Sequence, residues 1–162
     1  MIYDKGALNN GLTFKYACDI LTAKMQDGTL NMLQSSNGAG GKAKLAAALF
    51  VPIVVNSAFA CELFIKSMLP TNTTGHKLNQ LFNLLDSDVQ EKIKNTTIDN
   101  IKKTTPSYCR QSFQDDLDNN SNIFAEWRYF HEKNNCSANL QFMSAFMNSI
   151  YDIAYNENKT ST

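Results

Sequence analysis

The most apolar stretch of the chain runs from Lys42 to Leu69, and its hydrophobic positions recur with a helical period. From Leu45 to Cys61 it contains no charged residue. A helix that is apolar on most sides has to be buried on most sides. We therefore expect a central helix here, which Pro52 kinks or interrupts. Its most apolar face comprises Ile53, Val54, Ala58, Cys61, Phe64, Ile65 and Met68.

Further amphipathic patterns surround this stretch, and all of them have the spacing of helices. The expected helices cover about residues 12–33, 76–86, 87–105, 107–117, 123–133 and 138–155. Thr73 or Thr74 is expected to cap the second of these, and Ser87 with Gln90 has the pattern of a capping box for the third. Short connections between amphipathic helices are typical of an antiparallel, up-and-down bundle. The expected fold class is therefore all-α.

The length of 162 residues fits one domain, residues 1–162, with one core. The segment 35–42 contains Gly-x-Gly-Gly-Lys, but its glycine spacing differs from that of a phosphate loop and no strand precedes it. A flexible loop is the better interpretation. Residues 156–162 form a polar tail that is expected to fray.

Composition limits the classes of function. Lys plus Arg and Asp plus Glu number 15 each, so a role with nucleic acid requires a local basic patch. Four separated cysteines and two histidines without a ligand spacing predict neither a metal site nor a cofactor. Asn56 and the charges at both ends of the apolar stretch argue against a membrane span, which needs about 20 residues. We expect a cytoplasmic protein with reduced thiols.

Two pairs of polar residues carry candidate chemistry. Glu62 and Lys66 lie four residues apart, which indicates either a simple ion pair on one helical face or a charged pair that faces a ligand phosphate or Arg128. Arg128 and His131 share a face if residues 123–133 are helical, and they combine a phosphate-binding group with a proton-transfer group. The alternative is structural, with Arg128 paired to a carboxylate.

Two other features favour a structural interpretation. His76 beside Gly75 is expected to cap the helix that follows it, because it has no evident catalytic partner in the sequence. Asp115, Asp116 and Asp118 lack the spacing and the glycine of a calcium loop, so they are expected to be solvated surface.

Three segments in order, NSAFACELFIKSML, GHKLNQLFNLL and IFAEWRYFHE, followed by a terminal amphipathic helix, resemble the HEPN superfamily (higher eukaryotes and prokaryotes nucleotide-binding). The resemblance covers about residues 42–155. It implies a four- or five-helix up-and-down bundle that is often a homodimer. It also implies either a ribonuclease toxin or defence component, or a non-catalytic partner of a nucleotidyltransferase.

In ribonuclease members of that family, an Arg is followed by His after four to six residues. Arg128 matches the Arg, but positions 133 to 135 hold Lys, Asn and Asn, and His131 comes after only two intervening residues. On a helix this shortens the axial separation to about 4.5 Å. By resemblance, Glu62, Lys66, Arg128 and His131 form one polar cluster, with Tyr129 beside Arg128.

Two functions follow from the resemblance. The first is an RNA- or nucleotide-associated module of a phage-defence or toxin–antitoxin system. If it is an enzyme, it is a metal-independent endoribonuclease in which Arg128 holds the phosphate and His131 moves the proton. The second is a non-catalytic dimerisation or protein-interaction module, in which Glu62, Lys66 and Arg128 form a structural ion-pair cluster. Implied partners are a second copy of the chain, RNA or a nucleotide, and an antitoxin or nucleotidyltransferase.

Overall fold

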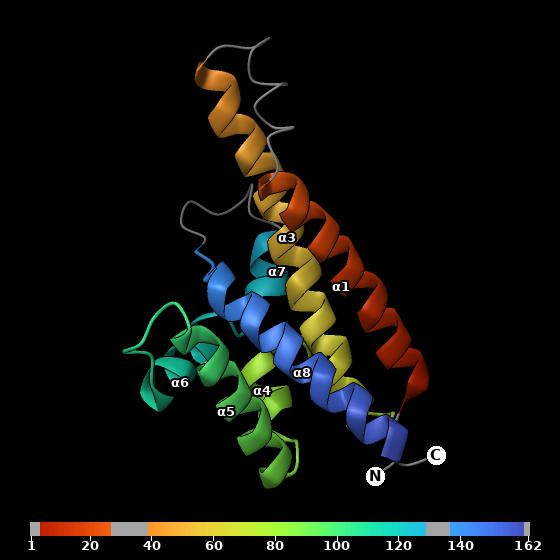
Figure 1. The fold of residues 1–162 in the computed structure, drawn as a ribbon. Coiled ribbons are helices and arrows are strands. Elements are labelled where there is room, and N and C mark those ends of the chain that lie inside the picture. Colours follow the sequence, from red (N-terminus) through yellow and green to blue (C-terminus); the bar gives the residue numbers. More distant parts are fainter. Residues whose placement is uncertain (1–3, 27–38, 129–136, 161–162) are drawn as a thin grey trace.

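Helix α3 (Ala39–Ser67) lies at the centre of the fold, with α1 (Lys5–Gln26) and α8 (Leu140–Thr160) running along it (Figure 1). The computed structural model describes residues 4–26, 39–128 and 137–160, and the side chains of residues 4–26, 49–128 and 137–156. Within these ranges the chain forms seven helices and no strand. The expected all-helical fold class is therefore confirmed.

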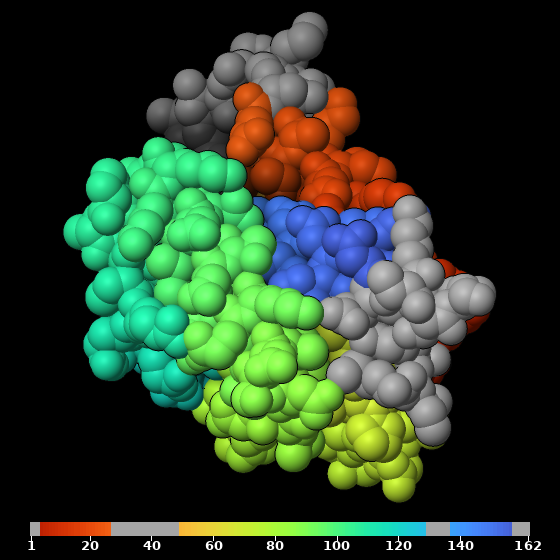
Figure 2. Space-filling view, turned by 60° about the horizontal axis from the view of Figure 1, so that its bottom comes forward, coloured from red at the N-terminus to blue at the C-terminus, as the bar shows by residue number. Residues whose placement is uncertain are grey.

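Four shorter helices cover the rest of the core: α4 (Leu78–Asn83), α5 (Ser87–Lys102), α6 (Arg110–Asn119) and α7 (Ile123–Arg128). Helices α4 and α7 pack on α3, whereas α5 packs on α8 and α6. Seen from another side, α8 forms a band of surface between α1 and α5 (Figure 2). Helix α8 thus joins the long helices to the group of shorter ones.

The apolar face expected for the central helix is the face that the fold buries. All seven of its predicted residues are at most 4% exposed, and Val54, Ala58, Cys61, Phe64 and Ile65 are completely buried. Pro52 lies inside α3, where it has no N–H to donate. Its own carbonyl oxygen accepts a hydrogen bond from the side-chain amide of Asn56, at 2.6 Å.

Helix α1 approaches α3 closely because a glycine stands at their contact. A Cβ atom added to Gly11 would lie 2.7 Å from two ring atoms of Phe64. Further along the same contact, the thiol of Cys18 donates to the carbonyl oxygen of Ile53, at 3.8 Å. Asp4 caps the start of α1 by accepting from the Ala7 N–H at 3.0 Å, and its own N–H donates to the Ser67 carbonyl at 3.0 Å.

Aromatic rings fill the core between α8 and the shorter helices. Phe113 of α6 lies edge-on to Phe142 and Phe146 of α8, at centroid separations of 5.7 and 5.9 Å. Phe82 of α4 contacts both Phe113 and Phe146. Such pairs each add about 0.5–1.5 kcal/mol beyond the burial of their area.

A polar network fixes the ends of α6 and α8. The carboxylate of Asp116 accepts from the Tyr108 hydroxyl at 2.8 Å and from the Asn139 side-chain amide at 2.9 Å. The carboxylate of Asp118 accepts from Asn79 at 2.9 Å and from Gln114 at 3.1 Å. These hydrogen bonds lower the pKa of Asp118 below its ordinary value. The aspartates therefore tie helices together, and no cluster of three metal-ligating side chains occurs in the described ranges.

The boundaries of several elements differ from the expected ones. The first helix begins at Lys5 rather than near Leu12 and ends at Gln26 in the described part, and α3 begins at Ala39, within the expected loop 35–42. Helix α8 continues to Thr160, through most of the tail that was expected to fray. The N-cap of α4 is Lys77 and that of α5 is Asp86, so the expected caps at Thr73, Thr74 and Ser87 do not form.

Within the described residues, one segment is long and apolar enough to cross a membrane. It is Leu49–Ser67 of α3, with a mean hydropathy of 1.7, and half of that window is buried inside the fold. The core helix of a soluble protein has the same properties. The burial of α3 by four other helices supports the interpretation of α3 as a core helix.

Candidate functional site

Arg128 ends α7 and is exposed to solvent. Its guanidinium carbon lies 5.2 Å from the centroid of the Phe124 ring, in a cation–π contact. The Phe124 ring in turn stacks on Phe59 of α3, with centroids 5.1 Å apart and an interplanar angle of 21°. The guanidinium is thus held at the surface by rings that are anchored on the central helix.

Helix α7 places Arg128 there because its other face is apolar. Ile123 and Trp127 are buried, and the Trp127 ring lies edge-on to Phe50 of α3 at 5.2 Å. The Trp127 Nε1–H donates to the Ser137 carbonyl at 3.4 Å. With this face against α3, Arg128 points outward.

Two predicted site residues, Tyr129 and His131, lie outside the described residues. The pairing of Arg128 with His131 therefore stays a prediction. Arg128 itself is exposed to solvent. The hydrogen-bond partners of Glu62 are Lys66 and His76, not Arg128.

The predicted ion pair of Glu62 and Lys66 is present, and its carboxylate is buried rather than exposed on the helix surface. Lys66 Nζ lies 2.8 Å from Glu62 Oε1, and the Glu62 side chain is only 3% exposed. Its other oxygen, Oε2, is buried and has no hydrogen-bond partner in the described structure. A buried acceptor without a hydrogen-bond partner lowers the stability of the fold, typically by about 1–3 kcal/mol.

His76 is the third member of this cluster, and its contact with Glu62 was not predicted from the sequence. Its Nδ1 lies 2.9 Å from Glu62 Oε1, and its side chain is 67% exposed. The expected role of His76 as a helix cap is wrong, because the N-cap of α4 is Lys77. Gly75, with φ +100°, adopts the left-handed conformation in the turn directly before His76.

The chemistry of this Glu62–Lys66–His76 cluster depends on which ring nitrogen of His76 carries the hydrogen. An ionised carboxylate only accepts hydrogen bonds, so beside ionised Glu62 the Nδ1 atom of His76 carries the hydrogen. In the neutral imidazole this leaves Nε2 as the acceptor, on the ring of an exposed side chain. The arrangement orients a histidine toward solvent, and it attaches the loop between α3 and α4 to the core.

The described thiols fall into two environments. Cys18 and Cys61 are buried and burial raises the pKa of each, whereas Cys109 is exposed at the N-cap of α6. Hydrogen bonds from the Ser112 hydroxyl and from backbone N–H groups lower the pKa of Cys109. Its Sγ lies 3.4 Å from Ser112 Oγ.

Comparisons with known proteins add no assignment: no family model, curated protein or solved structure matches this chain.

Proposed function

We propose that this chain is a HEPN-like helical module that associates with RNA or nucleotides, with Arg128 as the phosphate-binding group. The observation that carries the proposal is the exposed guanidinium of Arg128, held over the Phe124 ring at the end of α7. A guanidinium presents its N–H donors in a planar fork that matches phosphate oxygens. The zero net charge means that affinity has to come from such local groups.

The catalytic form of the proposal is a metal-independent endoribonuclease. Arg128 holds the scissile phosphate, and His131 serves as acid or base across a homodimer interface. The ribose 2′-oxygen forms a bond to phosphorus while the bond from phosphorus to the 5′-oxygen breaks. The base takes the 2′-hydroxyl proton, and the leaving 5′-oxygen receives one, so a cyclic phosphate and a 5′-hydroxyl result. We place the protein in the cytoplasm, in a defence or toxin–antitoxin setting with an antitoxin or nucleotidyltransferase partner.

The test is RNA cleavage in the presence of a metal chelator. The parent protein is expected to cleave, and Arg128→Ala and His131→Ala are each expected to lose at least about 100-fold in rate. Arg110→Ala is the matched control, because Arg110 is an exposed arginine of α6 that pairs with Glu91 of α5. Unchanged cleavage by Arg128→Ala would contradict the assignment of the phosphate-binding group. Absence of cleavage by the parent protein would contradict the proposal that the chain is a ribonuclease.

A second function is a non-catalytic dimerisation or protein-interaction module, with the cluster at Glu62 serving structure only. Tyr16 and Ile20 favour it, because they are 57% and 63% exposed and lie one turn apart on α1. The test is the mass in solution. In this interpretation the parent is a dimer that Ile20→Glu converts to a monomer, whereas Ser107→Glu, on an exposed turn, leaves it unchanged. A monomeric parent would exclude self-association.

A further inference from the structure

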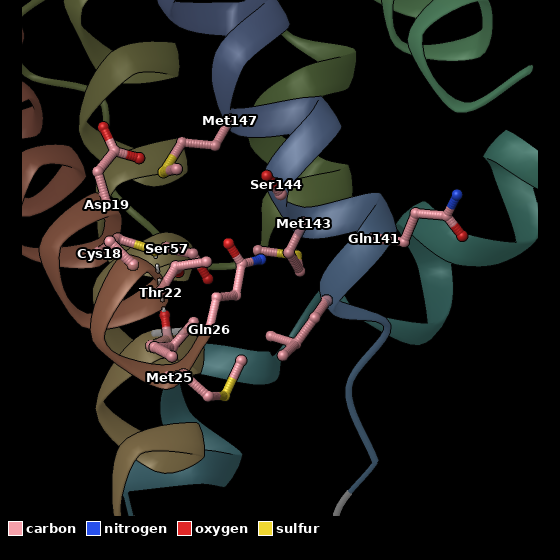
Figure 3. A pocket seen from close by; sticks show the side chains of 13 residues that line it. Cys18, Asp19, Thr22, Met25, Gln26, Ser57, Gln141, Met143, Ser144 and Met147 are labelled. Atoms are coloured by element: carbon pink, nitrogen blue, oxygen red, sulfur yellow. Dashed lines mark hydrogen bonds between the residues drawn. The ribbon is translucent and has the colours of Figure 1, made fainter. Parts of the chain in front are cut away.

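The hollows beside α1 differ in how far their linings are exposed. The hollow between α1 and α8 (Figure 3) rests on side chains that are at most 3% exposed, those of Ile53, Ser57, Met143 and Met147. It therefore offers a ligand little surface. A second cavity, of about 430 Å³, lies where the start of α1 faces the end of α3 and the loop that follows α3. Pockets of roughly 300–1,000 Å³ are the size that binds small molecules.

The lining of this second cavity is polar and accessible to solvent. Asn10 and Thr71 are exposed, and Asp4, Lys66 and Thr73 are half-buried. Within the described part of the chain, the side chains of Asn10, Thr71 and Thr73 have no hydrogen-bond partner. No aromatic residue is among the described residues that line the cavity. It thus presents unused donors and acceptors, and no ring on which a flat aromatic ligand would stack.

The cavity contains one negative and one positive side chain, and each retains hydrogen-bonding capacity. Asp4 accepts from the Ala7 N–H through Oδ1, at 3.0 Å, so its Oδ2 remains to bind a ligand. Lys66 Nζ donates to Glu62 at 2.8 Å, and an ammonium has three donors, so two remain. Lys66 is paired with Glu62 and not with Asp4. The two charges are therefore neighbours in the cavity without neutralising each other.

These two charges select among ligands. A ligand that is only an anion is attracted by Lys66 and repelled by Asp4, whereas a ligand that is only an amine is attracted by Asp4 and repelled by Lys66. A small zwitterion satisfies both, because it carries the two opposite charges in one molecule. Glu62 lowers the attraction that Lys66 exerts on an anionic group, and the partial positive charge at the start of α1 raises it.

From these features we infer that the cavity binds a small zwitterionic amino acid. The carboxylate of the ligand binds the ammonium of Lys66, and its own ammonium binds Oδ2 of Asp4. The hydroxyl of Thr71 supplies a further hydrogen bond, and Leu63 forms an apolar wall for a short side chain. The site is independent of phosphate binding at Arg128, which does not line the cavity, so either function can fail without the other.

The test is a titration of the full chain with free glycine, alanine and serine, followed by backbone amide NMR shifts. At least one of them is expected to bind with a dissociation constant on the order of 1 mM. The largest shifts are expected at Gly6, Ala7, Asn10 and Thr71. The amide of the tightest binder lacks the carboxylate, and its N-acetyl derivative lacks the ammonium. Each derivative is expected to bind at least about fivefold more weakly than the amino acid itself.

Two variants distinguish the cavity from non-specific binding. Asp4→Asn removes the charge and retains a residue that caps helices, and it is expected to weaken binding at least about fivefold. Asp86→Asn is the matched control, because Asp86 is an exposed aspartate at the N-cap of α5, outside the cavity. Asn10→Tyr fills the cavity from an exposed position on α1 and is expected to abolish binding.

Several results would overturn the inference. The first is the absence of binding by all three amino acids. The second is an amide or N-acetyl derivative that binds as tightly as the amino acid, because one of the two charges would then have no role. The third is binding that Asp4→Asn or Asn10→Tyr leaves unaltered while thermal denaturation shows that the variant is folded.

Discussion

The carboxylate of Glu62 and the imidazole of His76, 14 positions apart in the sequence, meet at 2.9 Å between Oε1 and Nδ1. Glu62 is buried on the central helix, and His76 is exposed on the loop that follows it. Lys66 binds the same oxygen at 2.8 Å. One buried oxygen of α3 thus binds both the lysine one turn further along that helix and the loop that follows the helix.

This cluster is expected to contribute to stability mainly through Lys66. Lys66→Met leaves the buried carboxylate with His76 as its remaining partner, and should lower the free energy of unfolding by about 1–3 kcal/mol. His76→Ala should cost less than about 1 kcal/mol, because the imidazole is largely exposed. Urea denaturation measures both.

The control for the cluster is Lys77→Met, which removes an exposed lysine next to His76. It should change the free energy of unfolding by no more than about 0.5 kcal/mol. A loss for Lys66→Met no larger than that of the control would show that Glu62 does not depend on its lysine partner.

Gly11 permits the close contact of α1 with α3, and its substitution is expected to be destabilising. Gly11→Ala improves helix propensity by about 1 kcal/mol. The new Cβ would lie 2.7 Å from the buried Phe64 ring, which has little room to move. Overpacking of this kind costs about 1–3 kcal/mol, so a net loss of stability is expected.

Gly6→Ala in the first turn of α1 is the comparison, because its nearest neighbour is the Asp4 side chain at 3.1 Å. Thermal denaturation should show a lower melting temperature for Gly11→Ala than for Gly6→Ala. The reverse order would mean that the two helices are not as close at Gly11 as the structure places them.

Cys109 is expected to react fastest among the three described cysteines. The Ser112 hydroxyl and backbone N–H groups hold its pKa below the ordinary thiol value, whereas burial raises the pKa of Cys18 and Cys61. Because the thiolate is the reacting species, the alkylation rate of Cys109 should rise at a lower pH than that of a thiol with the ordinary pKa.

Peptide mapping after timed iodoacetamide treatment between pH 6 and pH 9 gives the rate for each site. Ser112→Ala should shift the Cys109 profile to higher pH, because it removes the largest cause of the lowered pKa. An unshifted profile in Ser112→Ala would show that the hydroxyl does not stabilise the thiolate.

Tyr108 makes stability depend on alkaline pH. Burial, together with its hydrogen bond to Asp116, holds the pKa of Tyr108 well above the usual value of about 10. The unfolded chain releases this proton near pH 10 and the folded chain retains it. The stabilisation is therefore complete below about pH 10 and is lost as the pH rises beyond that value, by up to about 1.4 kcal/mol per pH unit.

The free energy of unfolding measured between pH 8 and pH 11 tests this dependence. Tyr108→Phe should flatten the alkaline decline, and Tyr16→Phe, at an exposed tyrosine, should not. Equal slopes for the parent and Tyr108→Phe would assign the decline to other groups.

The sequence predicted the helices better than the contacts between them. All seven residues expected on the apolar face of α3 are buried, because an uncharged helix can be accommodated only in a core. The Glu62–Lys66 pair was predictable for a similar reason, since both residues lie on one helix. His76 was not, because its position depends on the path of a loop that helical periodicity does not describe.

The caps show the same limit. The pattern of Ser87 and Gln90 predicted a capping box, yet Gln90 donates to the Leu85 carbonyl at 2.7 Å instead. Arg128 was chosen as a candidate from the segment IFAEWRYFHE. The sequence could not show that its side chain is exposed, which the structure does.

The most direct test of the proposed function is the affinity of Arg128→Ala for single-stranded RNA, measured beside Arg110→Ala at two salt concentrations. We expect Arg128→Ala to bind about tenfold more weakly and to reduce the salt dependence by about one phosphate contact. Arg110→Ala should bind within about twofold of the parent. Equal affinity of the parent and Arg128→Ala, or an equal loss in both variants, would contradict the assignment of Arg128 as the phosphate-binding residue.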